Sequence, residues 1–457
     1  MRNTDKLAGR HVIVLGLARS GVAVAKLLND LQANVLVNDY KPREECPEAE
    51  ELERLGIPVL CGGHPDGLIS DEVDLLVKNP GIPYEIKPVV QALEKDIPVV
   101  TEVEIAGAVS DSPVIGITGS NGKTTTTTLV GEMLTRSGVK NRVAGNIGQA
   151  LAEVVKVSKA DEWLVTELSS FQLKGTRSFK PKAAALLNVY PAHLDYHHHM
   201  EDYFSSKMKL FQNQTKEDVA VLNLDDPYCR KAGEQIQSNI WWFSRLNEVP
   251  KGVFIREGIV IAKYSDYREE PVIPVSEIAL RGDFNLENAL AAIALSLSAG
   301  ANAAGICEVL KTFSGVEHRL EYVTTINGVR YYNDSKATNP QAATRALESF
   351  KEPVIWIGGG LDRGIDFKEM TPVFSKKARA IIAYGQTRDI LVERGREAGL
   401  EEVHAADNLK NAVEIASRLA RPGDVVLLSP ACASWDQYTS FEERGSIFKE
   451  TVHSLQI

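Results

Sequence analysis

The chain has 457 residues, of which 44% are hydrophobic and 25% are charged, and its formal net charge is -10 at pH 7. This length is about three times the commonest domain size, and the composition is ordinary for a globular protein, so we expect several domains with separate cores. The acidic balance argues against a general nucleic-acid or anionic-membrane surface.

The cysteines and the apolar stretches bear on the compartment. Five cysteines are scattered along the chain without a CxxC pair, a pattern that indicates neither a disulfide framework nor a zinc site and favours a reducing cytosol. No stretch is long and apolar enough to span a membrane, and the N-terminus lacks the pattern of a signal peptide. We therefore expect a soluble cytoplasmic protein without nucleic-acid or membrane partners.

The first predicted domain, residues 1–102, begins with a buried strand at residues 11–15, a glycine-bearing turn and a helix over residues 22–31. A second strand follows and ends in Asp39, where a ribose-binding acid stands in dinucleotide-binding folds. The turn from Gly16 to Gly21 lacks the middle glycine of GxGxxG, which leaves less room for a pyrophosphate. The pattern favours a nucleotide placed differently from NAD.

The second predicted domain, residues 103–316, contains the strongest local motif of the chain. An apolar strand leads into Gly119-Ser120-Asn121-Gly122-Lys123-Thr124 and then into a helix. Backbone N–H groups and a helix N-terminus at such a turn can cradle phosphates, while Lys123 neutralises their charge and Thr124 binds Mg²⁺. Ile117 stands where the strict P-loop pattern has its first glycine. A glycine-rich turn that binds nothing is the alternative.

Several single residues gain meaning beside this loop. Glu167 and Asp334 each lie near a strand end, where a carboxylate can reach a metal, ribose or phosphate, although such residues are more often caps. His193 follows a strand and could bind a divalent ion. The run 197–199 of three histidines is interpreted as a solvated loop or helix start, since adjacent side chains do not converge. From its residues alone, Lys207 is an ordinary solvated helix lysine.

The third predicted domain, residues 317–457, again alternates strands and helices, and its strands end in small or polar residues. Ligands gather at such ends of open parallel sheets. We expect an α/β protein of three domains, each a mostly parallel sheet flanked by helices. The first and third are expected to be Rossmann-like, and the second to be a P-loop ATPase domain.

The chain contains TGSNGKT, TELSSFQL, AGNIG, NVYPAHLDYH, NDSKATNP and LLSPACASWDQYTSFEERG in this order. With these motifs it resembles the Mur ligase family from end to end. TGSNGKT alone would fit the wider superfamily that includes folylpolyglutamate synthases, whereas GLARSG, DSKATN and SPACASWDQY resemble the D-glutamate-adding members. The resemblance implies an ATP-dependent ligase of cytoplasmic peptidoglycan precursor synthesis, which adds D-glutamate to UDP-N-acetylmuramoyl-L-alanine through an acyl phosphate.

The resemblance also implies a set of site residues. The catalytic residues would be Lys123, His193, Lys207 and Arg319, and the metal ligands Thr124, Glu167, His193 and Lys207. ATP would be bound by Gly119, Ser120, Asn121, Gly122, Lys123, Thr124, Thr125, Asn285, Asn288, Arg319 and Asp334. The uridine-nucleotide substrate would be bound by Leu17, Ala18, Asp39, Lys41, Asn79, Gly81 and Asn146, and D-glutamate by Lys336, Thr338, Arg363, Ser434 and Phe441.

By the same resemblance we expect two Mg²⁺ ions, a CO₂-derived carbamate on Lys207, and a monomer whose second and third domains close on ATP. Arg363 replaces a lysine of some members, and Asn79 replaces a serine. A ligase of the same superfamily that adds a different amino acid remains an alternative, as does a binding protein that keeps the fold without catalysis.

Overall fold

The computed structural model describes residues 7–280, 282–313 and 315–455. The chain forms two compact units, one of Met1–Ile278 and Glu287–Lys311, the other of Ala279–Leu286 and Thr312–Ile457. The first unit contains two sheets and the second contains one. Within the described ranges, no helix combines the length and apolar character needed to cross a lipid bilayer.

The first sheet has five parallel strands in the order β3-β2-β1-β4-β5. Its strands are short and rich in Val, Ile and Leu, as parallel strands covered on both faces are, and four of the five residues of β1 are buried. The strands are β1 (His11–Leu15), β2 (Asn34–Asn38), β3 (Val59–Leu60), β4 (Leu75–Lys78) and β5 (Val99–Val100), and the helices are α1 (Arg19–Asp30), α2 (Glu48–Arg54), α3 (Lys87–Glu94) and the short η2 (Arg43–Glu45).

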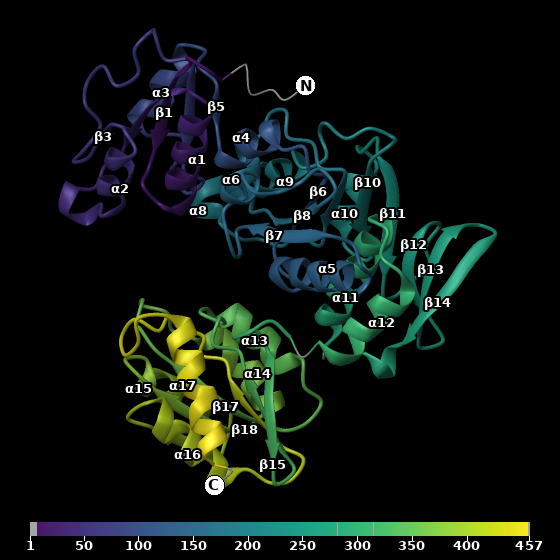
Figure 1. The fold of residues 1–457 in the computed structure, drawn as a ribbon. Helices are drawn as coiled ribbons and strands as arrows, with labels where there is room; N and C mark the ends of the chain where they lie inside the picture. The colour runs from purple at the N-terminus through teal and green to yellow at the C-terminus, as the bar shows by residue number, and fades with distance from the viewer. Residues whose placement is uncertain (1–6, 281, 314, 456–457) are drawn as a thin grey trace. The chain divides into compact units, whose positions relative to one another are not determined.

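The second sheet has nine strands in the order β14-β13-β12-β11-β10-β9-β6-β8-β7, and only β13 and β14 run antiparallel to their neighbours. Figure 1 shows α5 and α11 on one face of this sheet, and α4 and α9 on the other. The strands are β6 (Val114–Thr118), β7 (Asn141–Gly145), β8 (Trp163–Glu167), β9 (Ala183–Leu186), β10 (Val219–Asn223), β11 (Asn239–Ser244), β12 (Gly252–Arg256), β13 (Ile259–Ser265) and β14 (Arg268–Pro274).

Three of the helices that accompany the second sheet, α5, α9 and α11, carry predicted ATP-binding or metal-binding residues. The helices beside this sheet are α4 (Glu102–Val109), α5 (Lys123–Arg136), α6 (Leu151–Val154), α7 (Ser170–Lys174), α8 (Leu194–His197), α9 (Met200–Met208), α10 (Pro227–Gly233), η3 (Val275–Glu277), α11 (Asp283–Ser298) and α12 (Ala303–Thr312). Helices α4 and α6 also pack on α1, so the first and second sheets share one continuous core.

The third sheet has six strands in the order β15-β16-β20-β17-β18-β19, and only β15 is antiparallel. Its strands are β15 (Glu321–Ile326), β16 (Val329–Asn333), β17 (Val354–Gly359), β18 (Ala378–Tyr384), β19 (Glu402–Ala405) and β20 (Val425–Leu428). Its helices are α13 (Pro340–Glu348), η4 (Lys368–Met370), α14 (Thr371–Lys377), α15 (Arg388–Glu397), α16 (Leu409–Leu419) and α17 (Phe441–Ser454). Two separate apolar clusters cover its two faces.

Three mostly parallel sheets flanked by helices confirm the predicted fold class. The departures from parallel order lie at sheet edges, where a hairpin can be added without disturbing the crossover helices. The borders expected at residues 102 and 316 stay a prediction.

Candidate active site

The predicted phosphate loop joins the buried strand β6 to helix α5. Gly122 is the N-cap residue of α5 and has φ = +81°, a conformation that L side chains rarely adopt. A Cβ atom at this position would also collide with the Asn288 side chain of α11. The glycine is therefore required by both backbone and packing, and Asn288, a predicted ATP-binding residue, lies directly against the loop.

Glu167, at the carboxyl end of β8, joins two other predicted site residues and is 2% exposed. The Thr124 hydroxyl donates to Glu167 Oε2 at 2.8 Å, and the Asn146 amide donates to Oε1 at 3.0 Å. A hydroxyl and a carboxylate are hard oxygen ligands of the kind that Mg²⁺ prefers. These residues therefore fit the predicted metal site beside the phosphate loop.

Lys207 is 1% exposed, so its interpretation as a solvated helix lysine is wrong. Its Nζ atom donates to the Gly119 carbonyl oxygen at 2.9 Å and lies 4.4 Å from the centre of the Tyr203 ring. The Lys123 Nζ atom donates to the same oxygen at 2.9 Å. Burial, together with the nearby Lys123 ammonium, holds the pKa of Lys207 well below its usual value.

His193 is the N-cap residue of the single-turn helix α8 and has φ = +56°. Its ring lies edge-on to Phe171, with 4.9 Å between centroids, and 6.3 Å from Tyr203. His193 and Lys207 thus share the neighbour Tyr203. This common neighbour places the predicted histidine and lysine metal ligands in one region, although their separate roles stay predictions.

The histidine run 197–199 is solvated only in part. His198 and His199 are exposed, as expected, and His199 caps the start of α9. His197 is instead fully buried, with Nδ1 2.9 Å from Asp202 Oδ2 and Nε2 2.9 Å from the Ser170 hydroxyl. The expectation of a solvated segment is therefore wrong for His197. Its two polar partners make burial of the imidazole possible.

Within the described ranges, no three His, Cys, Asp or Glu side chains form a metal-binding group. The predicted ligand set does not need such a group, because it combines a hydroxyl, a carboxylate, an imidazole and Lys207. A lysine ammonium cannot bind a cation, whereas a carbamate supplies anionic oxygens. The fit of the second predicted ion therefore depends on the chemical state of Lys207.

Six of the seven residues predicted to bind the uridine nucleotide follow the ends of β1, β2 and β4, and the seventh, Asn146, follows β7. Asp39 accepts the Leu17 N–H at 2.6 Å and the Lys41 N–H at 2.9 Å, so one carboxylate orders both loops. Asn79 accepts the Ser20 hydroxyl at 2.8 Å. The remaining predicted members, Ala18 and Gly81, lie in the same loops.

In the second unit, Asp334 directly follows β16 and is buried. It accepts the Ser429 hydroxyl at 2.8 Å and the Leu320 N–H at 3.1 Å. Burial raises the pKa of Asp334 to about 7, against the opposing effect of these hydrogen bonds and of Arg319 and Arg444. The predicted residue Arg319 therefore belongs to the electrostatic surroundings of Asp334.

The residues predicted to bind D-glutamate lie in three loops of this unit. Lys336 Nζ lies 3.7 Å from the centre of the Phe441 ring, and Ser434 is 1% exposed. Arg363 is exposed, and its guanidinium lies 5.1 Å from the centre of the Trp435 ring. Thr338 is half-buried two residues after Lys336.

Arg444, which the sequence interpretation missed, organises these loops. It is fully buried in α17, and its guanidinium donates to the Ser335 carbonyl at 2.8 Å, the Ser335 hydroxyl at 3.0 Å and the Cys432 carbonyl at 3.1 Å. It thereby joins the DSKATN loop to the SPACAS loop. The sequence signal is an arginine that follows two acidic residues at a helix start in FEERG, a pattern equally typical of a solvated face.

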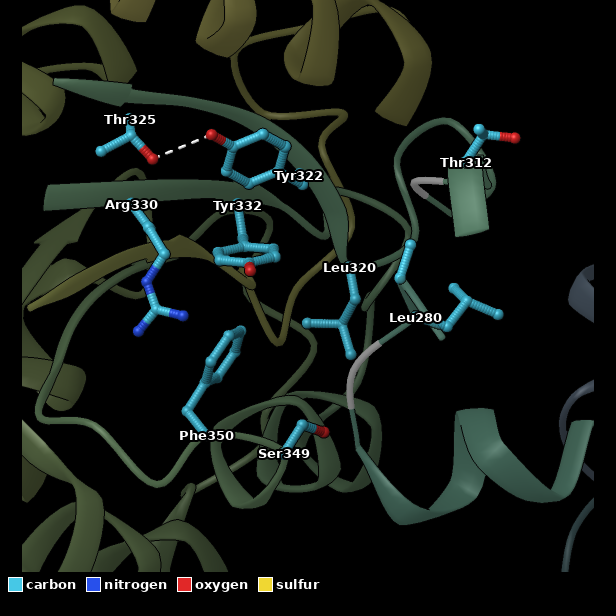
Figure 2. Close-up of a pocket in the computed structure, with 10 residues that line it drawn as sticks. Leu280, Thr312, Leu320, Tyr322, Thr325, Arg330, Tyr332, Ser349 and Phe350 are labelled. Carbon is cyan, nitrogen blue, oxygen red and sulfur yellow. Dashed lines mark hydrogen bonds between the residues drawn. The ribbon is translucent and has the colours of Figure 1, made fainter. Parts of the chain in front are cut away.

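Figure 2 shows a separate pocket of about 410 Å³ in the second unit. Tyr332 and Phe350, whose rings pack edge to face with 4.9 Å between centroids, line it together with Arg330. Of the residues predicted for ligand binding, none lines this pocket. It is distinct from the loops that follow β16 and β20.

Three family models match the chain. They are the Mur ligase MurD-like N-terminal domain over residues 10–101, the Mur ligase middle domain over 117–296, and the glutamate ligase domain of Mur ligases over 318–432. Together they cover most of its length.

Similar proteins agree with these matches. The chain is 50% identical to a UDP-N-acetylmuramoylalanine–D-glutamate ligase of Geobacillus sp. strain WCH70 and 46% identical to that of Bacillus subtilis strain 168, over the full length of both partners. A UDP-N-acetylmuramate-alanine ligase, MurC, of Thermotoga maritima has the same fold, with TM-score 0.58, 19% identity, and 97% and 99% of the two chains covered. With full-length identity of this order, the chain belongs to the Mur ligase family.

Proposed function

We propose that this chain is an ATP-dependent ligase that joins the amine of D-glutamate to the alanyl carboxylate of UDP-N-acetylmuramoyl-L-alanine in the cytoplasm. The observation that carries the proposal is the meeting of the phosphate loop with buried Lys207 at the Gly119 carbonyl, beside the Thr124 and Glu167 pair. The relatives carry the substrate names, since they are UDP-N-acetylmuramoylalanine–D-glutamate ligases at up to 50% identity.

The reaction needs ATP because a carboxylate oxygen is a poor leaving group. Transfer of the γ-phosphoryl group to the alanyl carboxylate gives an acyl phosphate and ADP. The D-glutamate amine then attacks the acyl carbon, phosphate leaves, and the amine loses a proton as the amide forms. Lys123 and Arg319 stabilise negative charge on the transferring group, and Mg²⁺ neutralises phosphate charge when bound.

Each unit would supply its own substrate contacts. The phosphate loop with Asn285 and Asn288 holds ATP, and Asp334 meets its ribose. Asp39 and the loops that it orders hold the uridine nucleotide. Lys336, whose ammonium lies on the Phe441 ring, would bind a carboxylate of D-glutamate in the loops that Arg444 joins.

The finer proposal is a carbamate on Lys207. Only a neutral amine adds CO₂, and burial, which holds the pKa of Lys207 well below its usual value, increases the share of the neutral form. The product is an anion with oxygen donors in the region of His193. It would turn a buried cation into a ligand for the second Mg²⁺ ion, which the ammonium cannot be.

The direct test measures phosphate release from ATP with UDP-N-acetylmuramoyl-L-alanine and one of D-glutamate, L-glutamate or L-alanine. We expect release, and a new amide product by mass spectrometry, with D-glutamate alone. Product formation with a different amino acid would favour the sister-ligase alternative, and binding without turnover would favour the non-catalytic one. Sedimentation of the same sample tests the expected monomer.

A further inference from the structure

Lys78 is a buried lysine that the proposed reaction does not use. It ends strand β4, directly before the predicted substrate loop 79–82, and is 1% exposed. Burial lowers the pKa of Lys78 to about 7, and the N–H groups of a buried lysine, charged or neutral, need acceptors around them. Lys78 has three, since Nζ donates to the Pro80 carbonyl at 3.1 Å, the Asn79 carbonyl at 3.3 Å and the Tyr196 hydroxyl at 3.1 Å.

Tyr196, in helix α8 beside the second sheet, contacts the same loop. Its hydroxyl accepts the Lys78 ammonium and lies 3.1 Å from the Pro80 carbonyl oxygen and 3.4 Å from that of Ile82. The Lys78 ammonium also lies 4.6 Å from the centre of the Tyr84 ring. Lys78 and Tyr196 thus form a clasp on the Pro80 carbonyl, contributed by segments 118 residues apart.

The clasp determines where the Gly81 N–H points. A trans peptide is planar, and its C=O and N–H point in opposite directions. Because Lys78 and Tyr196 hold the Pro80 oxygen on one side, the Gly81 N–H must point to the other side. Proline has no N–H of its own, so Gly81 supplies the first N–H of the loop after Asn79. A directed backbone N–H is a suitable donor for a phosphate oxygen.

Tyr196 also belongs to α8, the single-turn helix that begins at His193. Four residues are too few to hold a helix in place by backbone bonds alone, so side chains must anchor it. Tyr196 anchors α8 to the loop 79–82, while its neighbour His197 anchors it to Ser170 and Asp202. The position of His193 therefore depends on both contacts.

From these contacts we propose that Lys78 and Tyr196 are positioning residues, which aim the Gly81 N–H at the diphosphate of the uridine-linked substrate and fix this loop to the helix that begins at His193. The inference rests on the proposed function for the identity of the substrate. The clasp would fix the position of the substrate's nucleotide relative to His193, the predicted metal ligand. The alanyl carboxylate would then lie next to the γ-phosphate of ATP.

Two variants test the clasp. Tyr196→Phe removes one hydroxyl and keeps the ring, and Lys78→Met keeps most of the side-chain volume while removing the donors. We expect each to raise KM for UDP-N-acetylmuramoyl-L-alanine roughly tenfold, as loss of a well-placed hydrogen bond does, with KM for ATP and D-glutamate within about twofold of wild type. A variant that merely folds less well would lose active enzyme without this selective change.

The link to His193 has a separate readout. At saturating ATP, the free Mg²⁺ concentration for half-maximal rate should rise in Tyr196→Phe. The double variant should show no more than the larger single effect on KM, because both residues act on one carbonyl. A rise in KM without a change in Mg²⁺ dependence would overturn the link between loop and helix, and additive effects would overturn the clasp.

Lys87→Met and Tyr267→Phe are matched controls. Lys87 pairs with Asp66 on the surface of the same sheet's helix α3, and Tyr267 is fully exposed. Both should behave as wild type. If wild type makes the D-glutamyl product and the clasp variants match it in every KM, this inference is wrong and the proposed function stands. If wild type makes no such product, calorimetry with UDP alone still tests the inference. UDP must then bind more weakly to both clasp variants than to wild type.

Discussion

The phosphate loop and helix α9 each bring a lysine to the same oxygen atom. The two regions differ in how well the role of that lysine can be predicted from the sequence. Lys123 and Lys207 both donate to the Gly119 carbonyl at 2.9 Å. The loop shows its predicted role in six consecutive residues. In α9 the proposed role of the lysine depends on how the helix packs, because burial and the nearby Lys123 together lower the pKa of Lys207.

The difference shows what a local pattern can encode. The role of Gly122 can be predicted from sequence because the turn needs a positive φ, which residues other than glycine rarely adopt. Lys207 looks like any helix lysine, although Tyr203 precedes it by four residues and both lie on the buried face of α9. That spacing from an aromatic residue is the one sequence signal that could have indicated burial.

The largest expected effect is at Lys123. Lys123→Ala should lower kcat roughly 1000-fold, because the ammonium acts on charge that develops in the transferring phosphoryl group. Steady-state phosphate release measures this. Lys140→Ala, which removes an exposed lysine paired with Asp161 after the same helix, should change little. Near-normal turnover of Lys123→Ala would mean that Lys123 of the phosphate loop does not act on the transferring phosphoryl group.

Lys207→Ala should lower kcat about 100-fold, a loss typical of a damaged metal site. Protein equilibrated with ¹³C-labelled CO₂ should show a carbamate carbon signal in wild type but not in this variant. The signal ties the effect to the carbamate rather than to packing. Active wild-type enzyme without the signal would leave Lys207 as a structural lysine.

Lys209→Ala is the control for this experiment. Lys209 ends the same helix, but its ammonium donates to the Lys174 and Thr176 carbonyls at 2.9 and 3.0 Å, away from Gly119. Burial lowers the pKa of Lys209 too, so this variant separates a depressed pKa from a place beside the phosphate loop. We expect it to keep both the labelled signal and most of the activity.

The fold followed from the sequence because strand and helix periods repeat throughout the chain. Buried strands such as β1 and β6 are continuous apolar runs, and glycine turns end them. For the site, the sequence predicts a role from local pattern only where the immediate neighbours form a motif, as at Thr124. The pairing of Thr124 with Glu167, 43 residues away, depends on strand order, which no local pattern gives.

Buried polar residues are where sequence interpretation failed. His197, Lys207 and Arg444 were each assigned to solvent or passed over, since isolated polar residues are mostly exposed. Each is buried because tertiary partners satisfy it: Ser170 and Asp202 for His197, and the Ser335 and Cys432 carbonyls for Arg444. Ser170 and Ser335 lie 27 and 109 residues from the side chains that they satisfy, so no local pattern shows these contacts.

A moderate effect is expected at Lys336. Lys336→Ala should raise KM for D-glutamate roughly tenfold or more, as loss of a charge-assisted hydrogen bond does, with KM for ATP little changed. Lys368→Ala, which removes an exposed lysine of η4, serves as the control. Equal rises in both KM values would indicate a general folding defect. A selective rise in KM for D-glutamate would show that the motif around Lys336 binds D-glutamate, so that a local motif predicts a binding site in the second unit too.

The smallest expected effect is on stability, at Asp334. This residue belongs to a sequence motif, but burial changes its pKa. Its pKa is raised from 3.8 to about 7, so between these values the folded protein binds more protons than the unfolded chain. Stability at this site is therefore present at low pH and is lost as pH rises through about 7. At about 1.4 kcal/mol for each tenfold change in proton affinity, this difference in pKa sets an upper bound of roughly 4 kcal/mol on the pH-dependent stability.

Asp334→Asn removes the titrating group while the amide oxygen can still accept the Leu320 N–H. The difference in Tm between this variant and wild type should therefore become more positive from pH 5 to pH 8. Asp389→Asn, at a position whose side chain is 87% exposed, should show no such trend. A constant difference for Asp334→Asn would mean that Asp334 titrates normally, so that burial has altered the chemistry of Lys207 but not of this carboxylate.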